Sequence, residues 1–404
     1  MNSGDTAFML VASALVMFMT PGLALFYGGL VRSKNVLSVF MQSFISLGLI
    51  SMAWVIFGYS LAFGPDVGGF IGNLDWIFLK GIGLKAGPYS DTIPDLLFVA
   101  FQMMFAIITP ALITGAIAER MKFSAYILFA LLWSTFVYLP VCHWVWGGGW
   151  IGGHGALDFA GGTVIHINSG AAALVAAIVL GKRKGYGRES FHPHNLTMTI
   201  LGASILWVGW FGFNAGSALA AGEIATLAFF TTQLSAGAAA LSWVIAEWKI
   251  QGKPTTLGAV SGAVAGLVAV TPAAGFVSPI SAIIIGLTAG VICYFAVLLK
   301  RKAGYDDALD VVGIHGVGGV WGALATGLFA STAWNPGGAD GLFFGNPWLL
   351  AIQAYGAFAT IIYSVIVTFI ILKIINATVG LRVDAETEVL GLDLAEHSEV
   401  GYTI

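Results

Sequence analysis

Residues 36–63 read VLSVFMQSFISLGLISMAWVIFGYSLAF and contain no charged side chain. A helix needs about 20 consecutive apolar residues to cross the hydrocarbon core of a bilayer, so this stretch predicts a membrane-spanning helix. Similar stretches occur before and after it. We therefore predict eleven spans, at residues 6–30, 36–63, 94–118, 123–142, 162–181, 196–216, 224–247, 256–272, 279–299, 311–330 and 347–375. The eighth span is short and rich in glycine.

The composition of the 404-residue chain also indicates an integral membrane protein. Apolar residues make up 58% of it and charged residues only 9%, whereas soluble domains carry about 25% charged residues. The apolar runs are continuous rather than alternating, which excludes an outer-membrane barrel. Basic residues are too few and too scattered for a nucleic-acid partner. Cys142 and Cys293 lie in separate apolar runs and predict neither a disulfide framework nor a metal site.

The basic residues orient the spans, because Lys and Arg are retained on the cytoplasmic side of a membrane. If the N-terminus lies outside, every Lys and Arg except Lys80 and Lys85 falls on the cytoplasmic side. A miscounted span would break this alternation, so the pattern supports eleven spans. An odd number of spans places the C-terminus in the cytoplasm. Residues 1–375 then form a membrane domain, and residues 376–404 form a polar cytoplasmic tail.

Two histidines stand at matched positions in the chain. His166, in the fifth span, follows Asp158 by eight residues, and His315, in the tenth span, follows Asp307 by eight residues. A glycine follows each histidine four residues later. Five spans separate the two segments and reverse their orientation in the membrane. The pattern therefore predicts two inverted halves with a transport site between them.

The two histidines have a structural and a functional interpretation. A buried imidazole can simply bond to a backbone carbonyl. Alternatively, the pair lines a narrow path, where imidazoles hydrogen-bond a small N–H solute or pass a proton. The matched positions favour the second interpretation. No third ligand stands at metal-binding spacing. Asp158 is expected to cap a helix start rather than to bind a cation directly.

Three groups of aromatic residues lie in or beside the spans. They are Phe101 and Phe105 with Gln102, then Trp144, Trp146 and Trp150 around a Gly-Gly-Gly, and finally WFGFNAGS at residues 210–217. A tryptophan near a span end usually belongs to an interfacial belt. The sharper hypothesis is an aromatic vestibule that binds a small cation by cation–π attraction, with Ser217 as a hydrogen-bond acceptor.

Several function classes lack their motifs in this sequence. No span has a central Lys, which excludes a retinal Schiff base. No Walker motif, glycine-rich nucleotide loop or nucleophile–base arrangement is present. An ATP-driven pump and a membrane enzyme are both disfavoured, and no cofactor is predicted.

Six stretches of the chain, from the first span to the tail, are similar to the ammonium transporter family. They are PGLALFYGGLVRSKNVLS (21–38), ITPALITGAIAERMKFSA (108–125), DFAGGTVIHINSG (158–170), GWFGFNAGSALA (209–220), DDALDVVGIHG (306–316) and GLRVDAETEVLGLDLAEHSEVGY (380–402). Trp146 and Ser217 resemble the Amt branch of the Amt/Mep/Rh superfamily. The resemblance implies an all-α fold of two inverted five-helix halves plus a long eleventh helix. It also implies a homotrimer with one pore per subunit.

The resemblance places the family's site residues on this chain. It implies an outer recruitment site of Phe105, Trp146 and Ser217, a gate of Phe105 and Phe213, a pore with His166, His315 and Trp210, and buried aspartates at Asp158 and, as a looser counterpart, Asp310. We hypothesise that ammonium is captured at the outer site and loses its proton near the gate. Ammonia then passes the two histidines, with or without the proton.

The acidic tail carries Arg382 and Asp384 and has two interpretations. It is either a disordered solvated end or, as the resemblance implies, an ordered regulatory region that PII-class nitrogen-regulatory proteins contact. The basic loops at residues 182–184 and 300–302 would be its neighbours. The expected location is a bacterial or archaeal inner membrane. Two alternatives are an ammonium sensor with weak transport and an electroneutral ammonia or carbon dioxide channel of Rh type.

Overall fold

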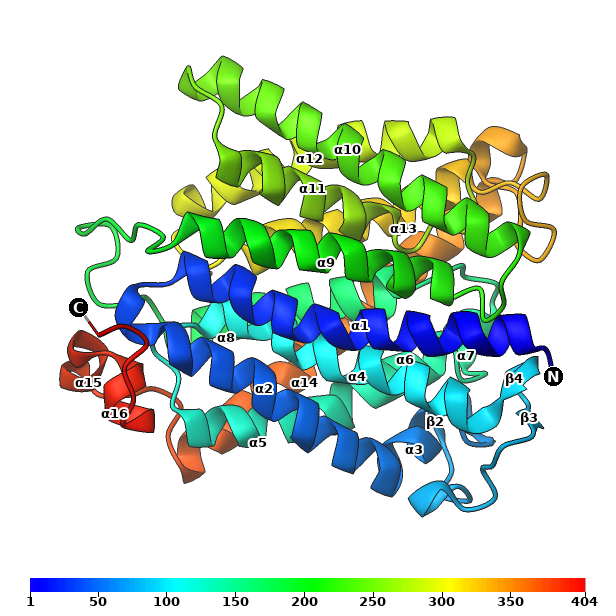
Figure 1. Cartoon of the computed structure of the whole chain (residues 1–404), viewed down its shortest axis with the longest axis horizontal. Coiled ribbons are helices and arrows are strands. Elements are labelled where there is room, and N and C mark those ends of the chain that lie inside the picture. Colours follow the sequence, from blue (N-terminus) through cyan, green and yellow to red (C-terminus); the bar gives the residue numbers. More distant parts are fainter. Residues whose placement is uncertain (404) are drawn as a thin grey trace.

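The computed structural model describes residues 1–403, which form a bundle of long helices running roughly side by side (Figure 1). The helices of the first part are α1 (Ser3–Leu30), α2 (Val36–Ala53), α3 (Tyr59–Phe63), α4 (Asp95–Ile117), α5 (Phe123–Trp133), α6 (Leu139–Val145), α7 (Trp150–Gly153) and α8 (Asn168–Leu180). The second part holds α9 (Leu196–Gly216), α10 (Glu223–Gln251), α11 (Thr256–Val270), α12 (Pro279–Ala303), α13 (Val317–Phe329) and α14 (Pro347–Thr378).

Four wider π-helical turns are built into these helices. They are η2 (Trp54–Gly58), η4 (Ser134–Tyr138), η5 (Gly162–Ile167) and η6 (Val312–Gly316). Short 3-10 turns occur at η1 (Ser33–Asn35), η3 (Ile77–Leu79) and η7 (Leu342–Phe344). Two small antiparallel hairpins pair β1 (Asp66–Val67) with β2 (Ile71–Gly72) and β3 (Ala86–Gly87) with β4 (Ser90–Pro94). Both hairpins lie between the second and third predicted spans and were not predicted.

Within residues 1–403, ten helices are long and apolar enough to cross a membrane, when the π-helical turns are counted with the helices they join. They coincide with ten of the predicted spans, and the protein is a multi-pass membrane protein. The remaining prediction, residues 256–272, forms α11, which has only 15 residues. At 1.5 Å per residue it is about 22 Å long, shorter than a bilayer core. It packs against α9, α10, α12 and α13.

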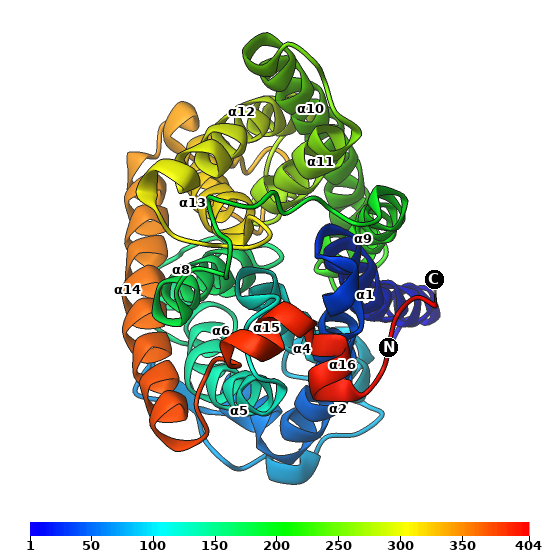
Figure 2. The same ribbon diagram turned by 90° about the vertical axis from the view of Figure 1, so that its left-hand side faces the viewer.

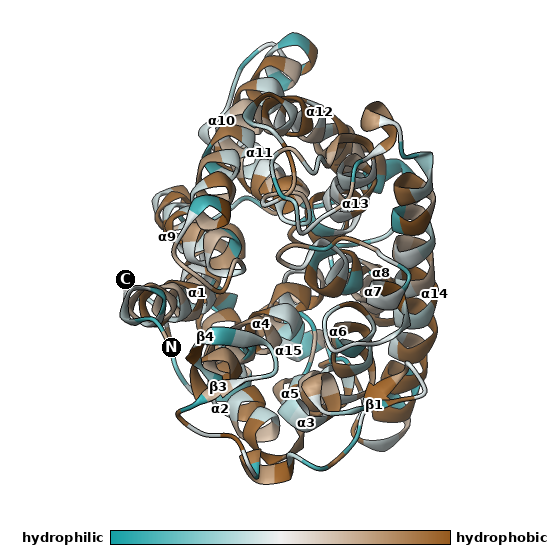
Figure 3. Cartoon of the chain, turned by 90° about the vertical axis from the view of Figure 1, so that its right-hand side faces the viewer, coloured by the Kyte–Doolittle hydropathy of each residue, from teal (hydrophilic) through white to brown (hydrophobic). Residues whose placement is uncertain are grey.

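The bundle has a first group of helices, α1 to α8, and a second group, α9 to α13, with α14 running along both (Figure 2). Small residues set the closest approaches between them. A Cβ on Gly202 of α9 would lie 2.2 Å from the backbone nitrogen of Phe26 on α1, so only glycine permits this contact. Polar residues gather mainly in loops and helix ends, seen from the end at which α1 begins (Figure 3).

The tail is ordered as two short helices, α15 (Ala385–Leu390) and α16 (Leu392–His397). They lie across the end of the bundle opposite to the start of α1, where α16 contacts α2 and η1 (Figures 1 and 2). We call this end the C-terminal end and the other the N-terminal end. The interpretation of the tail as a disordered extension is therefore wrong.

Candidate functional site

An open cavity of about 520 Å³ lies at the N-terminal end of the bundle. Its lining includes Gln102, Trp146, Asp158, Phe159, Ser217, Phe276 and Asn335. The indole N–H of Trp146 donates to the carbonyl of Asp158 over 2.8 Å, which fixes the ring against the wall. The hydroxyl of Ser217 donates to the carbonyl of Phe213 over 2.8 Å. Its oxygen lone pairs are therefore left to accept a hydrogen bond from a molecule in the cavity.

Two phenylalanine rings pack against each other beside this cavity. The ring centroids of Phe105 on α4 and Phe213 on α9 lie 4.4 Å apart at an interplanar angle of 30°. Trp146 stands edge-on to Phe105, with centroids 5.9 Å apart. Both phenylalanines are almost fully buried. The structure thus brings the predicted recruitment and gate residues together from the middle of α4 and from the ends of α6 and α9.

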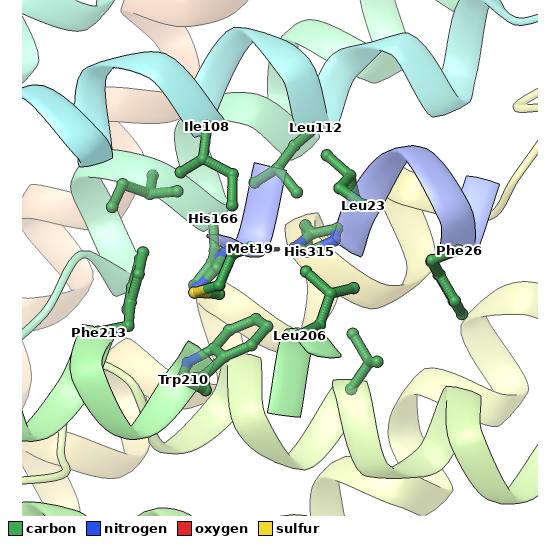
Figure 4. Close-up of a pocket in the computed structure, with 12 residues that line it drawn as sticks. Met19, Leu23, Phe26, Ile108, Leu112, His166, Leu206, Trp210, Phe213 and His315 are labelled. Atoms are coloured by element: carbon green, nitrogen blue, oxygen red, sulfur yellow. Dashed lines mark hydrogen bonds between the residues drawn. The ribbon is translucent and has the colours of Figure 1, made fainter. Parts of the chain in front are cut away.

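A narrow apolar space lies beyond the phenylalanine pair (Figure 4). It holds about 10 Å³, close to the room that one water molecule needs. Its lining comprises Met19, Leu23, Phe26, Ile108, Leu112, Ile165, His166, Leu206, Trp210, Phe213, Val264 and His315. Among these, only His166, Trp210, Phe213 and His315 were predicted, because the other apolar side chains carry no signal that separates pore lining from packing.

His166 and His315 are the polar groups in this space. Their Nδ1 atoms lie 3.2 Å apart, and their rings stack with centroids 5.2 Å apart. A hydrogen bond at this distance needs one Nδ1 to donate and the other to accept. One neutral ring therefore carries its proton on Nδ1 and the other on Nε2. The Nε2 atom of His166 is buried and has no partner among the described residues, so it is free to bond a small solute.

Trp210 forms the wall beside the histidines. Its ring stacks on His166 with centroids 5.5 Å apart and an interplanar angle of 24°. Its indole N–H donates to the hydroxyl of Thr271 over 2.9 Å, just beyond the end of α11. The turn that follows the short α11 therefore holds Trp210 in place beside the histidines.

Asp158 explains why His166 stands where it does. Its Oδ1 accepts the backbone N–H groups of Gly161 and Gly162, and its Oδ2 accepts those of Thr163 and Val164, at 2.6–3.1 Å. A carboxylate at a helix start satisfies N–H groups that would otherwise lack partners. The helix it starts is the π-helical η5, which carries His166. This geometry agrees with the capping role expected from the sequence.

Asp307 holds the matching position in the second half of the chain, but it caps with a single bond, and its Oδ1 has no partner among the described residues. Its Oδ2 accepts the N–H of Val312, the first residue of η6, which carries His315. Asp310, which the family resemblance implied as the counterpart of Asp158, instead forms an ion pair with Lys300. The equal eight-residue spacing therefore identified the capping aspartate of the second half, and the family resemblance did not. Burial raises the pKa of Asp307 to about 6, and the neighbouring Lys300 opposes that shift.

Glycine lets the two histidine helices meet. A Cβ on Gly170 would lie 2.2 Å from the Cα of Gly316, and a Cβ on Gly319 would lie 3.0 Å from the Cβ of His166. The backbones of α8 and η6 are therefore in direct contact. This contact brings the two rings within hydrogen-bonding distance.

Gln102 is a cavity residue whose role the sequence did not reveal. It belongs to the predicted aromatic group on α4 and lines the outer cavity. Its Oε1 is buried and has no partner among residues 1–403. An unpaired buried acceptor is costly unless a ligand or water satisfies it.

A second open cavity, of about 700 Å³, lies at the C-terminal end. An ion-pair network that was not predicted borders it. Glu119 accepts from Arg32 over 3.1 Å and from Arg183 over 2.9 Å, and Arg183 also donates to Asp306 over 2.9 Å. Burial alone would raise the pKa of Glu119, but Arg183 and then Arg32 hold it below its ordinary value.

The tail joins this end through named contacts. Arg382 donates to Glu388 over 2.6 Å and to the carbonyl of Leu180 over 2.9 Å, and Glu388 accepts the N–H of Lys184. Asp384 caps α15 by accepting the N–H of Thr387 over 2.8 Å. The predicted neighbourhood with residues 182–184 is therefore present.

Residues 300–302 were also predicted to lie beside the tail, but Lys300 bonds to another part of the chain. Lys300 bonds to Asp310 and to the carbonyl of Asp307. Lys34 takes its place beside the tail and donates to the carbonyls of Glu388 and Val389.

Comparison with known proteins identifies the family. The model of the Ammonium Transporter Family matches residues 7–402. The chain belongs to the ammonium transporter family. An ammonium transporter of Bacillus subtilis is 57% identical over 403 residues, covering 100% of this chain and 99% of the relative. The ammonium transporter Amt1 of Archaeoglobus fulgidus is 49% identical and matches both chains over their full length.

Solved structures of family members share the fold. The crystal structure of Candida albicans Mep2 superposes with a TM-score of 0.91 at 37% identity, covering 100% of this chain and 91% of Mep2. A structure described as a sensor Amt protein superposes with a TM-score of 0.90 at 29% identity, covering 98% of each chain. Ammonium transport is therefore the function that the relatives support for this family member.

Proposed function

We propose that this protein captures ammonium in the cavity at the N-terminal end, removes a proton beside Phe105 and Phe213, and conducts ammonia past His166 and His315. The order of features along one path carries this proposal. An open aromatic cavity leads to a closed phenylalanine pair, then to a space the size of one water, and then to two hydrogen-bonded imidazoles.

Capture of the cation is assigned to Trp146, Phe105 and Ser217. Each aromatic face offers a cation–π attraction of about 0.5–2 kcal/mol. Potassium has the same charge and a similar size, so charge alone does not discriminate. Ammonium donates hydrogen bonds and potassium does not. Oxygen lone pairs bind both cations, but two acceptors suit the directional N–H bonds of ammonium, whereas they give potassium only part of the oxygen shell that it needs. We therefore assign the preference for ammonium to Ser217 and to Oε1 of Gln102.

Loss of the proton follows from the size of the next space. A charge without its water shell is costly in an apolar membrane interior, by a few to more than about ten kcal/mol. Neutral ammonia is close to water in size and fits the space of about 10 Å³ beside the histidines. The unpartnered Nε2 of His166 can take the proton from ammonium when that ring carries its own proton on Nδ1. The Nδ1 proton then crosses to His315, whose Nε2 releases its proton on the far side, and the neutral ammonia follows. We therefore propose net transport of ammonia and a proton.

The comparisons favour a transporter over a sensor for this chain. The relatives named ammonium transporters are 46–57% identical to it, whereas the sensor Amt protein is 29% identical. We further propose a homotrimer in the cell's inner or plasma membrane. Its tail would be the contact region for a PII-class regulatory protein. The ordered tail helices on the C-terminal end support such a docking surface.

The testing experiment is a current measurement on proteoliposomes adsorbed to a solid-supported membrane. An ammonium pulse should give a transient current, and equal pulses of potassium should give none. Methylammonium should give a smaller current. A rise in internal pH without any current would overturn the coupled step in favour of electroneutral ammonia conduction. If neither a current nor a change in internal pH is observed, the proposal of transport is itself wrong.

A further inference from the structure

The cavity at the N-terminal end is far larger than ammonium requires. Its volume is about 520 Å³, whereas the space beside His166, which fits one small molecule, holds about 10 Å³. Pockets of about 300–1,000 Å³ that are lined by aromatic rings and a few polar groups typically bind organic molecules. Trp146 and Ser217 account for only one part of the lining, so most of the wall has no role in the capture of ammonium.

Three aromatic rings form one side of this cavity. Phe63 ends α3, Phe98 lies on α4, and Tyr89 lies between β3 and β4 at the N-terminal end (Figure 1). The rings of Tyr89 and Phe98 are nearly parallel, with centroids 4.8 Å apart at an interplanar angle of 5°. The ring of Phe63 stands across both, with centroids 5.0 and 5.1 Å away at 78° and 82°. We call these three residues the aromatic wall.

Hydrogen bonding and packing hold the aromatic wall in place. The hydroxyl of Tyr89 donates to the carbonyl of Phe63 over 2.6 Å, which ties the β3–β4 hairpin to the end of α3. Phe63 and Phe98 are almost fully buried. Because the rings are fixed in advance, a ligand that binds to them loses little free energy in ordering the site.

Further aromatic rings border the same cavity. Phe159 and Phe276 meet edge to face, with centroids 5.4 Å apart at 87°. The indole of Trp146 is fixed by its hydrogen bond to the carbonyl of Asp158. All of these rings line the cavity together with the aromatic wall. A ligand in the cavity is therefore surrounded by aromatic side chains.

The charge of the lining suits a cation. Asp158 is its one carboxylate, and within the described residues no Lys, Arg or His lines the cavity. Aromatic faces attract cations through the negative charge of their π-systems, and cages of such rings recognise quaternary and methylated ammonium groups. The methyl groups of such a cation donate no conventional hydrogen bond, so the rings can hold it without a polar partner.

We propose that the outer cavity is a binding site for N-methylated organic ammonium cations, which the aromatic wall of Phe63, Tyr89 and Phe98 holds by cation–π attraction. This inference goes beyond the proposed function, because such a cation is held and not conducted. Tetramethylammonium has no N–H proton to release, and it is too large for the space of about 10 Å³ beside His166. It therefore inhibits transport by occupying the cavity. Only its competition with ammonium rests on the proposed capture of ammonium in this cavity.

The series from dimethylammonium through trimethylammonium to tetramethylammonium tests the inference on the native protein. Each added methyl group removes an N–H donor and adds apolar surface. Binding to the aromatic wall should therefore strengthen along the series, whereas binding through Ser217 and Gln102 should weaken. In proteoliposomes, tetramethylammonium should give no current, raise the KM for ammonium and have the lowest inhibition constant of the series. The reverse order of inhibition constants, or a current from tetramethylammonium itself, overturns the inference.

Two variants of Tyr89 test the aromatic wall directly. Tyr89→Leu removes one ring, whereas Tyr89→Phe keeps the ring and removes only the hydroxyl. The inhibition constant of tetramethylammonium should rise about fivefold in Y89L, as for the loss of one cation–π contact, and by a larger factor than the KM for ammonium. It should stay near the native value in Y89F. The exposed Phe343 lies outside the cavity lining, and F343L should change neither quantity. Equal inhibition constants in Y89L and Y89F overturn the inference.

Direct binding separates this inference from ammonium capture. Calorimetric titration of the protein in detergent with tetramethylammonium should show binding that is weaker in Y89L than in Y89F. If this result is obtained but W146L leaves the KM for ammonium unchanged, capture at Trp146 is wrong and the aromatic wall is supported. If W146L raises the KM while tetramethylammonium neither binds nor inhibits, the inference is wrong and capture at Trp146 is supported.

Discussion

The imidazoles of His166 and His315 meet through their Nδ1 atoms, 3.2 Å apart, rather than through Nε2. This leaves the two Nε2 atoms at the outer corners of the pair. One Nε2 is an acceptor and the other is a donor, because the shared bond fixes opposite tautomers. The pair exchanges these roles only when three transfers take place: one ring takes a proton on its free Nε2, the Nδ1 proton crosses the shared bond, and the other ring releases its Nε2 proton. A solute that bonds one Nε2 is therefore coupled to the protonation of the other ring.

Replacing His166 by Asn should separate hydrogen bonding from proton transfer. An asparagine amide can still donate to Nδ1 of His315, but it cannot pass a proton. Because positioned proton-transfer groups contribute about 100-fold or more, the ammonium current should fall at least about tenfold. The same replacement at exposed His154 should leave the current unchanged. Native current in H166N would show that the ring pair does not carry the proton.

Replacing Phe213 by Ala should open the pathway between the outer cavity and His166. The stack with Phe105 at 4.4 Å would be lost, and removal of a buried phenylalanine costs about 3–5 kcal/mol of stability. Water can then enter beside the histidines, so a potassium pulse should give a current that the native protein lacks. A matched Phe343→Ala change at an exposed site should give none. Retained discrimination against potassium in F213A would place the selective step outside this pair.

The sequence predicted two kinds of feature, namely long apolar segments and a motif that occurs twice. Charge alternation and apolar length located the spans, and the equal spacing from Asp158 to His166 and from Asp307 to His315 located the ring pair. That spacing works because each aspartate caps the π-helical turn that presents its histidine. The family resemblance instead implied Asp310 as the counterpart of Asp158, but Asp310 forms an ion pair with Lys300.

Other features depend on contacts between distant segments and gave no local signal. His143 lies on α6, and its Nε2 lies 2.9 Å from Oδ1 of Asp66, which is 77 residues away in a short hairpin whose strands have only two residues each. Glu119 and Arg183 meet only when two helix ends come together. The length of α11 is set by the turn at Thr271, which anchors Trp210. A residue-by-residue pattern cannot locate these partners.

Replacing Asp158 by Asn should destabilise the protein rather than alter selectivity directly. The amide nitrogen would face two backbone N–H groups that now donate to a carboxylate oxygen. Hydrogen bonds to charged groups contribute about 1.5–3 kcal/mol each, so a loss of about 3 kcal/mol or more is expected. Thermal unfolding in detergent measures it, with exposed Asp91→Asn as the matched change. Equal midpoints for both variants would contradict the capping role.

Glu119 should make stability fall in acid. Arg183 and Arg32 outweigh its burial and hold the pKa of Glu119 below its ordinary value of 4.5. A carboxylate with a lowered pKa stabilises the fold above its unfolded pKa, and this stability is lost as pH falls through the folded pKa. Thermal stability should therefore drop below about pH 4.5, and less steeply in E119Q.

At neutral pH, E119Q should be less stable than the native protein. Removing one partner of a buried ion pair costs about 3–5 kcal/mol, because Arg183 is left without part of its compensation. Exposed Glu386→Gln on α15 is the control and should change neither value. A native acid profile in E119Q would assign the acid sensitivity to another carboxylate, such as Asp306.

Removing residues 384–404 tests the tail. The deletion removes Glu388, which bonds to Arg382 and Lys184. It also removes Asp393, whose oxygens accept the N–H groups of Leu37 over 3.0 Å and of Ser38 over 2.8 Å at the start of α2. These contacts tie the ends of α2, α8 and α14 together, so ammonium current should fall several-fold. Capture of a PII-class protein on the liposomes should be lost. The variant Val400→Ala keeps these contacts and should bind and transport normally. If the deletion leaves both current and binding unchanged, the tail is neither a coupling element nor the docking region, and the ordered helices serve only to cover the C-terminal end.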